Sequence, residues 1–307
     1  MEIKSYKNKK LITNFVLKTK KGNIGGIDIQ DPRAEQINLL EVDFKDPDKY
    51  MAFELQEISK FTTDSFETIF LTPNNISLLL HIYRNELKKY KLTLENHVLK
   101  NNLGEKYKKK NKLTYTSKMI YEMIQFAETA IIFGYTAVEA FANSCIPENY
   151  TYEFKNNKGI LEKYDLKAIE RWLSLSDKLK NVLAEVFGKH DLVDQQFWSD
   201  FKELESLRNS IIHLKKEDHD FFYVFFKKST IRVIESAEKI IDYFVNMETN
   251  VGLPLSGFKD GLFVFKSKIP AEEVKNLDVG FLSEIDSNKS CKLKELLKNF
   301  KDNKHER

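Results

Sequence analysis

The predicted fold rests on one stretch of the chain, Phe201-Lys-Glu-Leu-Glu-Ser-Leu-Arg-Asn-Ser-Ile-Ile-His-Leu214. Its apolar residues recur at intervals of three and four, which is the spacing of one face of a helix. The members of that face are Phe201, Leu204, Leu207, Ile211 and Leu214. The pattern predicts an amphipathic helix that turns this face to a core and leaves its other face polar.

The same helix carries Arg208, Asn209 and His213, the residue types needed to cleave RNA without a metal ion. A histidine exchanges protons near neutral pH, and an arginine offers a planar set of donors to a phosphate. On an ideal helix Arg208 and His213 lie roughly 140° apart, which is wide for joint action on one phosphate. The spacing requires a local distortion of the helix, or a twofold dimer in which two copies of the motif meet. The alternative interpretation is a surface arginine and a solvated histidine.

Two segments follow one another in an order known from one protein family. Leu207-Arg-Asn-Ser-Ile-Ile-His-Leu214 resembles the Arg-(polar)-x3-His motif of HEPN domains, helical bundles found in many prokaryotic defence and toxin ribonucleases. Upstream, Tyr135-Thr-Ala-Val-Glu-Ala-Phe-Ala-Asn-Ser-Cys-Ile-Pro147 resembles the Tyr-x-Ala-x-Glu-Ala-x-x-Asn helix that precedes the motif in several HEPN groups. The resemblance covers roughly residues 115 to 248.

This resemblance implies an antiparallel helical bundle that cleaves RNA without a metal or cofactor and leaves a 2′,3′-cyclic phosphate. His213 would act as general base or acid, Arg208 would stabilise charge on the phosphorane, and Asn209 would orient the phosphate. The active site would be shared by two protomers. The biology would be phage defence through growth arrest, or a toxin held by an antitoxin or sensor protein. Lys215 stands where relatives paired with nucleotidyltransferases have a tyrosine, so that pairing is not expected.

Glu139 and Asn143 lie one turn apart on the upstream helix and are candidates to hold Arg208 or His213 in place. The alternative is a solvent-facing polar stripe, because other polar residues fall on nearly the same line. Those residues are Glu122, Gln125, Thr129 and Thr136.

Six lysines are candidate contacts to RNA phosphates. They are Lys106, Lys108, Lys109, Lys110, Lys112 and Lys215. A solubilising linker between domains is the favoured alternative for the run from 106 to 112. The aromatic run from Phe221 to Phe226 suggests base stacking, with packing in a core or a dimer as the favoured alternative.

The composition is that of an ordinary globular protein, with 307 residues, 42% hydrophobic, and a net charge of +3. Any positive field must therefore be local. Cys145 and Cys291 are too far apart to suggest a metal site or a disulfide framework. The N-terminus lacks an apolar signal core, and the most apolar run, 130–142, is interrupted by Glu139. We expect a soluble cytoplasmic protein with no membrane span.

Local patterns predict a mostly α fold in three parts. An N-terminal region, 1–112, contains strands within 11–45 and a helix over about 72–90. A HEPN-like bundle, 113–250, has helices at about 116–145, 167–187, 195–215 and 219–247, with Gly188 ending the second. A mixed α/β C-terminal extension, 251–307, has a strand at 261–269 and a short helix at 292–300.

The sequence thus predicts a HEPN-type endoribonuclease acting on single-stranded or loop RNA. Its rival is a non-catalytic HEPN-like bundle that serves as a dimerisation or RNA-binding subunit of a larger complex. The modest net charge favours the rival, and the intact Arg-Asn-x3-His favours the enzyme. Metal-dependent chemistry is not expected, because no carboxylate cluster has a suitable spacing.

Overall fold

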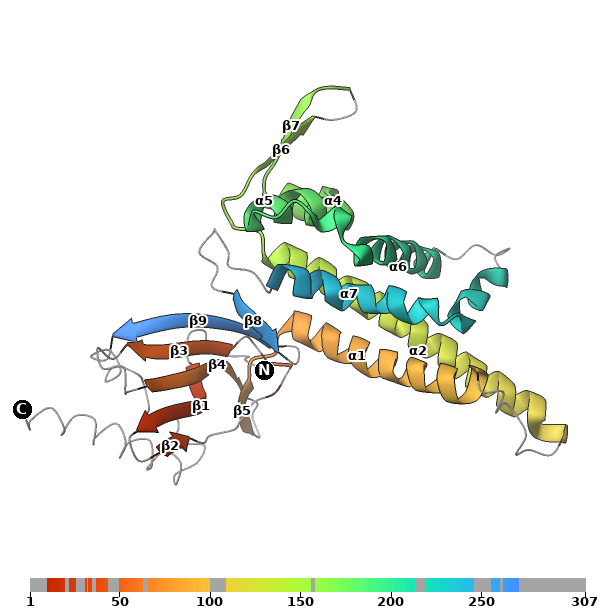
Figure 1. The fold of residues 1–307 in the computed structure, drawn as a ribbon, viewed down its shortest axis with the longest axis horizontal. Coiled ribbons are helices and arrows are strands. Elements are labelled where there is room, and N and C mark those ends of the chain that lie inside the picture. The colour runs from red at the N-terminus through yellow and green to blue at the C-terminus, as the bar shows by residue number, and fades with distance from the viewer. Residues whose placement is uncertain are drawn as a thin grey trace, which may run out of the picture. The chain divides into compact units, whose positions relative to one another are not determined.

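The structure is a computed structural model that describes residues 10–19, 22–25, 31, 33–34, 37–43, 50–62, 66–99, 109–155, 158–213, 219–245, 255–259 and 262–270. The chain forms two compact units. One consists of Met1–Asn74 with Pro254–Arg307, and the other of Asn75–Leu253. The fold is mostly helical with a smaller β part, as the sequence predicts (Figure 1).

The first unit contains a seven-stranded sheet in the order β2-β1-β4-β3-β9-β8, with β5 paired to β4. Its strands are β1 (Lys10–Thr19), β2 (Gly22–Gly25), β3 (Ile37–Asp43), β4 (Tyr50–Thr62), β5 (Glu67–Leu71), β8 (Leu255–Lys259) and β9 (Leu262–Pro270). β4 is long enough to pair with different strands in its two halves. Residues 50–57 pair with β1, and residues 58–62 pair with β5.

The first and last parts of the chain share this sheet, because β3 pairs in parallel with β9 from Ile37↔Val264 to Asp43↔Pro270. The strands expected within 11–45 and at 261–269 are present. The separate N-terminal region and C-terminal extension expected from the sequence are instead one unit. Local alternation indicates a strand but carries no information about a partner more than two hundred residues away. The helix expected at 292–300 lies outside the described residues.

Four long helices build the second unit: α1 (Asn75–Thr93), α2 (Lys109–Ser144), α6 (Gln196–Ile212) and α7 (Ser229–Val245). α1 and α2 run side by side in opposite directions, and α2 also packs against α6 and α7 (Figure 1). Tyr83 and Tyr90 of α1 are fully buried and donate to the carbonyls of Ile234 (3.2 Å) and Phe225 (2.8 Å). α1 therefore belongs to the bundle, and the division expected at residue 112 is displaced to residue 74.

The helix expected at 167–187 is broken into short pieces. They are α3 (Leu166–Trp172), α4 (Leu175–Asp177), a π-helical turn η2 (Lys178–Leu183) and α5 (Ala184–Phe187). Ser174 interrupts the run because its hydroxyl accepts from the amide of Asp177 (3.1 Å) and caps α4. Gly188 ends α5 with φ of 64°, the left-handed cap that its residue type predicts.

Two further departures from the expected helices concern short elements. Residues 219–226 form a 3₁₀ helix, η4 (His219–Phe226), so α7 begins at Ser229 rather than at 219. Between α2 and α3 the chain forms an antiparallel hairpin, β6 (Tyr152–Lys155) with β7 (Leu161–Tyr164), that the sequence patterns do not predict.

Gly134 lets α2 approach α1 and α7 closely. A Cβ at this position would lie 2.8 Å from Cδ2 of Tyr83 and 3.2 Å from Cβ of Ala237. We expect Gly134→Ala to lower the free energy of unfolding by about 1–3 kcal/mol through overpacking, despite the higher helix propensity of alanine. Urea denaturation measures this change, with Gln125→Ala on the exposed side of α2 as the control. Equal or greater stability of Gly134→Ala would contradict the close approach.

The buried tyrosines of α1 predict an alkaline loss of stability. Burial raises the pKa of Tyr83 and of Tyr90 above the ordinary value of 10.0. Above about pH 10 the unfolded chain loses these two protons while the folded state keeps them. The contribution of the two tyrosines to the free energy of unfolding is therefore complete below about pH 10 and is lost as the pH rises further.

We expect the double variant Tyr83→Phe/Tyr90→Phe to lose stability less steeply than the wild type above about pH 10, because it lacks both ionisable groups. Urea denaturation at a series of alkaline pH values gives the two slopes. Tyr121→Phe, at an exposed position of α2, is the matched control. Parallel slopes for the wild type and the double variant would show that Tyr83 and Tyr90 do not cause the alkaline loss of stability.

Candidate functional site

α6 is held in the bundle by the apolar face that the sequence predicts. Phe201, Leu204 and Leu207 are buried, and Ile211 is half-buried. Leu214 lies outside the described residues. The carboxylate of Asp200, itself buried, pairs with Nε of Arg232 on α7 at 3.0 Å. The direction in which the polar face of α6 points is therefore fixed by the packing of its apolar face and by the Asp200–Arg232 ion pair in its N-terminal half.

The helix ends where the expected catalytic motif ends. Ile212 is its last residue, and His213 is the C-cap with φ of −120° and ψ of 32°. The amide of His213 still donates to the carbonyl of Asn209 at 3.0 Å, and both side chains are exposed. The backbone thus leaves helical geometry at His213 itself, the last residue of the motif.

Arg208 lies over an aromatic ring rather than against a carboxylate. Its Cζ is 5.2 Å from the centre of the Tyr135 ring, and its Nη1 donates to Oδ1 of Asn209 at 3.0 Å. Within the described part of the chain it forms no ion pair with an aspartate or glutamate. A cation held by a ring and a neutral amide keeps its full charge for an anionic ligand.

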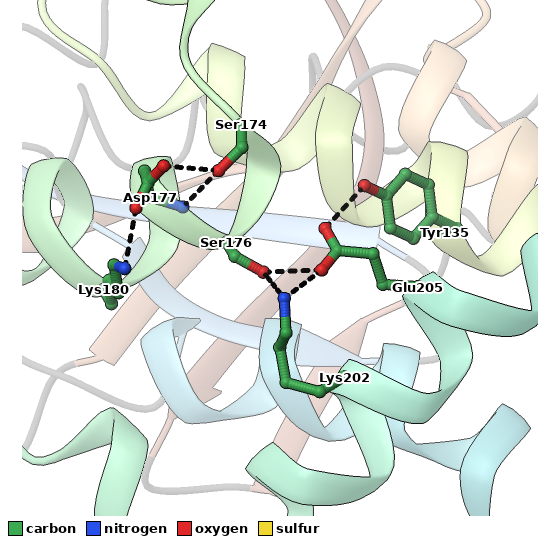
Figure 2. Close-up of polar contacts among 7 residues, drawn as sticks. All are labelled: Tyr135, Ser174, Ser176, Asp177, Lys180, Lys202 and Glu205. Atoms are coloured by element: carbon green, nitrogen blue, oxygen red, sulfur yellow. Dashed lines mark hydrogen bonds and ion pairs between the residues drawn. The ribbon is translucent and has the colours of Figure 1, made fainter. Parts of the chain in front are cut away.

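A network around Glu205 fixes the ring of Tyr135 (Figure 2). The ring stacks on Phe201 with a centroid distance of 6.1 Å and an interplanar angle of 7°. The phenol donates to Oε1 of Glu205 at 3.1 Å, and the Ser176 hydroxyl donates to Oε2 at 2.9 Å. Lys202 donates to the Ser176 hydroxyl at 2.8 Å and forms an ion pair with Glu205. Burial, reinforced by the charge of Glu205, raises the pKa of Tyr135, so the phenol remains a donor.

These network residues were not singled out from the sequence. Tyr135 does belong to the segment that resembles HEPN domains. Lys202 and Glu205 are three residues apart on the polar face of α6, a spacing that indicates an ion pair. Their connection to Ser176 and Tyr135 depends on packing between elements far apart in the sequence.

A second polar cluster lies nearby at the start of α4 (Figure 2). The Ser174 hydroxyl donates to Oδ2 of Asp177 at 2.6 Å, and Nζ of Lys180 lies 2.7 Å from Oδ1. Burial works against the charge of Asp177, but the bonds from Lys180 and Ser174 outweigh it and hold the pKa of that carboxyl below its ordinary value. These contacts cap the helix, which is a structural role.

Asn143 supports a buried lysine rather than the catalytic motif. Its Oδ1 accepts from Nζ of Lys178 at 2.9 Å, and the same Nζ donates to the carbonyl of Glu170 at 2.9 Å. Lys178 is fully buried, and this burial lowers the pKa of its ammonium group. Glu139 is half-buried, and its charge acts on Lys178 and on Tyr135. Asn143 was a candidate to hold Arg208 or His213, but in the described structure Arg208 contacts Tyr135 and Asn209 instead.

The candidate RNA-binding lysines lie away from Arg208. Lys109, Lys110 and Lys112 are in the first turn of α2, which makes that part of the basic run helical rather than a linker. At about 1.5 Å per residue, Lys112 and Tyr135 are roughly 35 Å apart along α2. The backbone positions of these lysines are therefore far along α2 from Tyr135, the residue that Arg208 contacts. Lys106, Lys108 and Lys215 lie outside the described residues.

The aromatic run divides between the core and the surface. Phe225 is buried and accepts from Tyr90 through its carbonyl, whereas the side chain of Tyr223 is 66% exposed. Core packing, the favoured interpretation, holds for Phe225.

A surface hollow of about 530 Å³ lies near the N-terminal end of α2. Residues of that helix alone line it: Leu113, Thr114, Ser117, Lys118, Tyr121, Glu122 and Gln125. None of the catalytic candidates is among them. A hollow bounded by one helix lacks the converging polar groups of a binding site.

In the described residues no group of three or more His, Cys, Asp and Glu side chains is arranged to hold a metal ion. Among the described helices, none has the length and apolar character needed to cross a membrane.

A scan against protein-family models and searches of curated proteins and of solved structures found no match to this chain. The resemblance to HEPN domains therefore rests on the motif residues themselves.

The bond between Asn143 and Lys178 makes a prediction about stability. Asn143→Leu leaves a buried ammonium group with one fewer acceptor, and we expect it to cost about 2–3 kcal/mol of unfolding free energy. Adding Lys178→Met removes the buried charge, so the double variant should regain much of that loss. Urea denaturation of the four proteins of this cycle measures the coupling. Additive effects of the two substitutions would contradict a direct interaction.

Proposed function

We propose that this protein is a metal-independent endoribonuclease whose catalytic groups are Arg208, Asn209 and His213. The observation that carries the proposal is the end of α6. There an exposed histidine caps the helix one turn after an exposed amide. That amide accepts a hydrogen bond from Arg208, whose charge no carboxylate of the described residues neutralises. This combination supplies a proton carrier and a phosphate ligand at one surface.

The reaction follows from these groups. The imidazole of His213 accepts the proton of a ribose 2′-hydroxyl, whose oxygen attacks the adjacent phosphorus. A protonated imidazole then gives a proton to the departing 5′-oxygen, leaving a 2′,3′-cyclic phosphate and a 5′-hydroxyl. Arg208 donates to the non-bridging oxygens as charge builds on the phosphorane. Because Oδ1 of Asn209 accepts from Arg208, its Nδ2 is left to donate to the phosphate.

A twofold dimer supports this chemistry better than one protomer. Each protomer has a single histidine in the motif, whereas base and acid catalysis in one turnover use two imidazoles. Pairing two α6 ends across a twofold axis brings two copies of His213 and of Arg208 to one phosphate. We place the protein in the cytoplasm, in phage defence or as a toxin restrained by an antitoxin or sensor protein. The substrate is single-stranded or loop RNA, whose backbone can adopt in-line geometry.

The rival function is a non-catalytic dimerisation or RNA-binding subunit. The observation that favours it is the nearly balanced charge of +3 for the whole chain, which offers no strong global attraction for RNA.

The deciding experiment is RNA cleavage in EDTA by the purified protein. We expect Arg208→Ala and His213→Ala each to lower the rate by about a hundredfold or more, because each removes a group that acts in the transition state. Matched controls are Arg171→Ala and His190→Ala, which remove an exposed arginine and an exposed histidine elsewhere in the bundle.

The product ends and the oligomeric state complete this test. Cyclic-phosphate ends from the wild type and the controls alone would establish the nuclease and its site. Equal cutting by all five proteins would place the activity elsewhere. Binding of RNA by a wild-type dimer without any cleavage would favour the rival.

A further inference from the structure

Glu205 lies one turn before Arg208 on the same helix, the spacing at which a glutamate and an arginine ordinarily pair. Here the carboxylate is engaged elsewhere. Oε1 accepts from the phenol of Tyr135 at 3.1 Å, and Oε2 accepts from the Ser176 hydroxyl at 2.9 Å. Lys202, one turn earlier on α6, forms the ion pair with Glu205. Arg208 instead lies on the Tyr135 ring.

The members of this network differ in exposure. Ser176 is 7% exposed and Tyr135 is 7% exposed, so both donors are fixed in the interior. The side chain of Glu205 is 15% exposed, and that of Lys202 is 46% exposed. Lys202 is therefore the one cation of this network and the member most open to solvent. It neutralises a carboxylate that otherwise has only neutral donors within the described network.

We propose that Lys202, with Ser176 and Tyr135, withholds Glu205 from Arg208 and so keeps the guanidinium available for a phosphate. Lys202 is then a positioning residue that acts through Glu205 and does not touch the substrate. This inference rests on the proposed nuclease function for its catalytic consequence. The arrangement of charges itself has consequences that are measurable without catalysis.

The physical reason is a competition between two cations for one carboxylate. Without Lys202, a half-buried negative charge remains with two neutral donors, and the next cation on the same face of α6 is Arg208. Pairing with Arg208 would lift the guanidinium from the ring of Tyr135 and neutralise it. A neutralised arginine binds a phosphate poorly, because the attraction to the phosphate depends on its net charge.

The test is a double-mutant cycle on Lys202 and Glu205. We expect Lys202→Ala to lower kcat/KM for RNA cleavage by about tenfold, a coupling typical of residues in one charge network. Lys202→Ala/Glu205→Gln should return to within about threefold of the wild type, because a neutral amide cannot neutralise Arg208. Lys202→Arg keeps the cation and should retain activity. Lys89→Ala is the matched control, since Lys89 is an exposed lysine that pairs with Glu86 three residues away on α1.

A second readout needs no nuclease activity. Phenylglyoxal modifies free guanidinium groups, and peptide mass spectrometry gives the rate at Arg208. We expect Lys202→Ala to slow that modification, Lys202→Ala/Glu205→Gln to restore it, and Lys89→Ala to leave it unchanged.

The outcomes separate the two proposals. If Lys202→Ala matches the wild type in both readouts, the withholding of Glu205 is refuted. If the double variant stays as impaired as Lys202→Ala, Lys202 acts directly on RNA and the positioning role is likewise refuted. If the wild type cleaves no RNA but the modification rates follow the expected order, the nuclease proposal fails and the positioning of Arg208 stands.

Discussion

The stack of Tyr135 on Phe201 is the contact on which the arrangement at the end of α6 depends. It joins α2 to α6 through two buried rings that lie nearly parallel. The phenol of Tyr135 donates to Glu205, and Arg208 lies over the Tyr135 ring. One side chain thereby links the apolar interior, a shared carboxylate and a surface cation. The C-terminal end of α6 is thereby anchored to the packed core beneath it.

Charge placement in this region follows a consistent physical logic. The buried Asp200, the half-buried Glu205 and the buried Lys178 each have a partner. Asp200 pairs with Arg232, Glu205 with Lys202, and Lys178 with Asn143. Unpaired charge costs most in the interior, so these pairs belong to the structure of the bundle. Arg208 sits at the boundary, where an aromatic face replaces a counterion. At the surface the desolvation cost of this charge is small, and the guanidinium remains open to an incoming anion.

Local patterns in the sequence predicted the features that depend on residues close together in the chain. The buried face of α6 follows from the spacing of Phe201, Leu204 and Leu207, and the end of α5 follows from the conformational freedom of Gly188. Features that depend on distant partners were not predictable in this way. The contact between Arg208 and Tyr135 and the pairing of β3 with β9 both depend on residues that only tertiary packing brings together. The catalytic role of the motif stays a prediction.

The parallel pairing of β3 with β9 makes the helical unit an insertion within the chain of the sheet unit. During synthesis, β1 to β5 leave the ribosome first and lack the partner strand that β3 requires. All of α1 to α7 is then made before β8 and β9 appear. The bundle can therefore fold while the sheet is incomplete, and the sheet closes last. A unit that carries the proposed cutting chemistry would be assembled before the other unit of the same chain has formed.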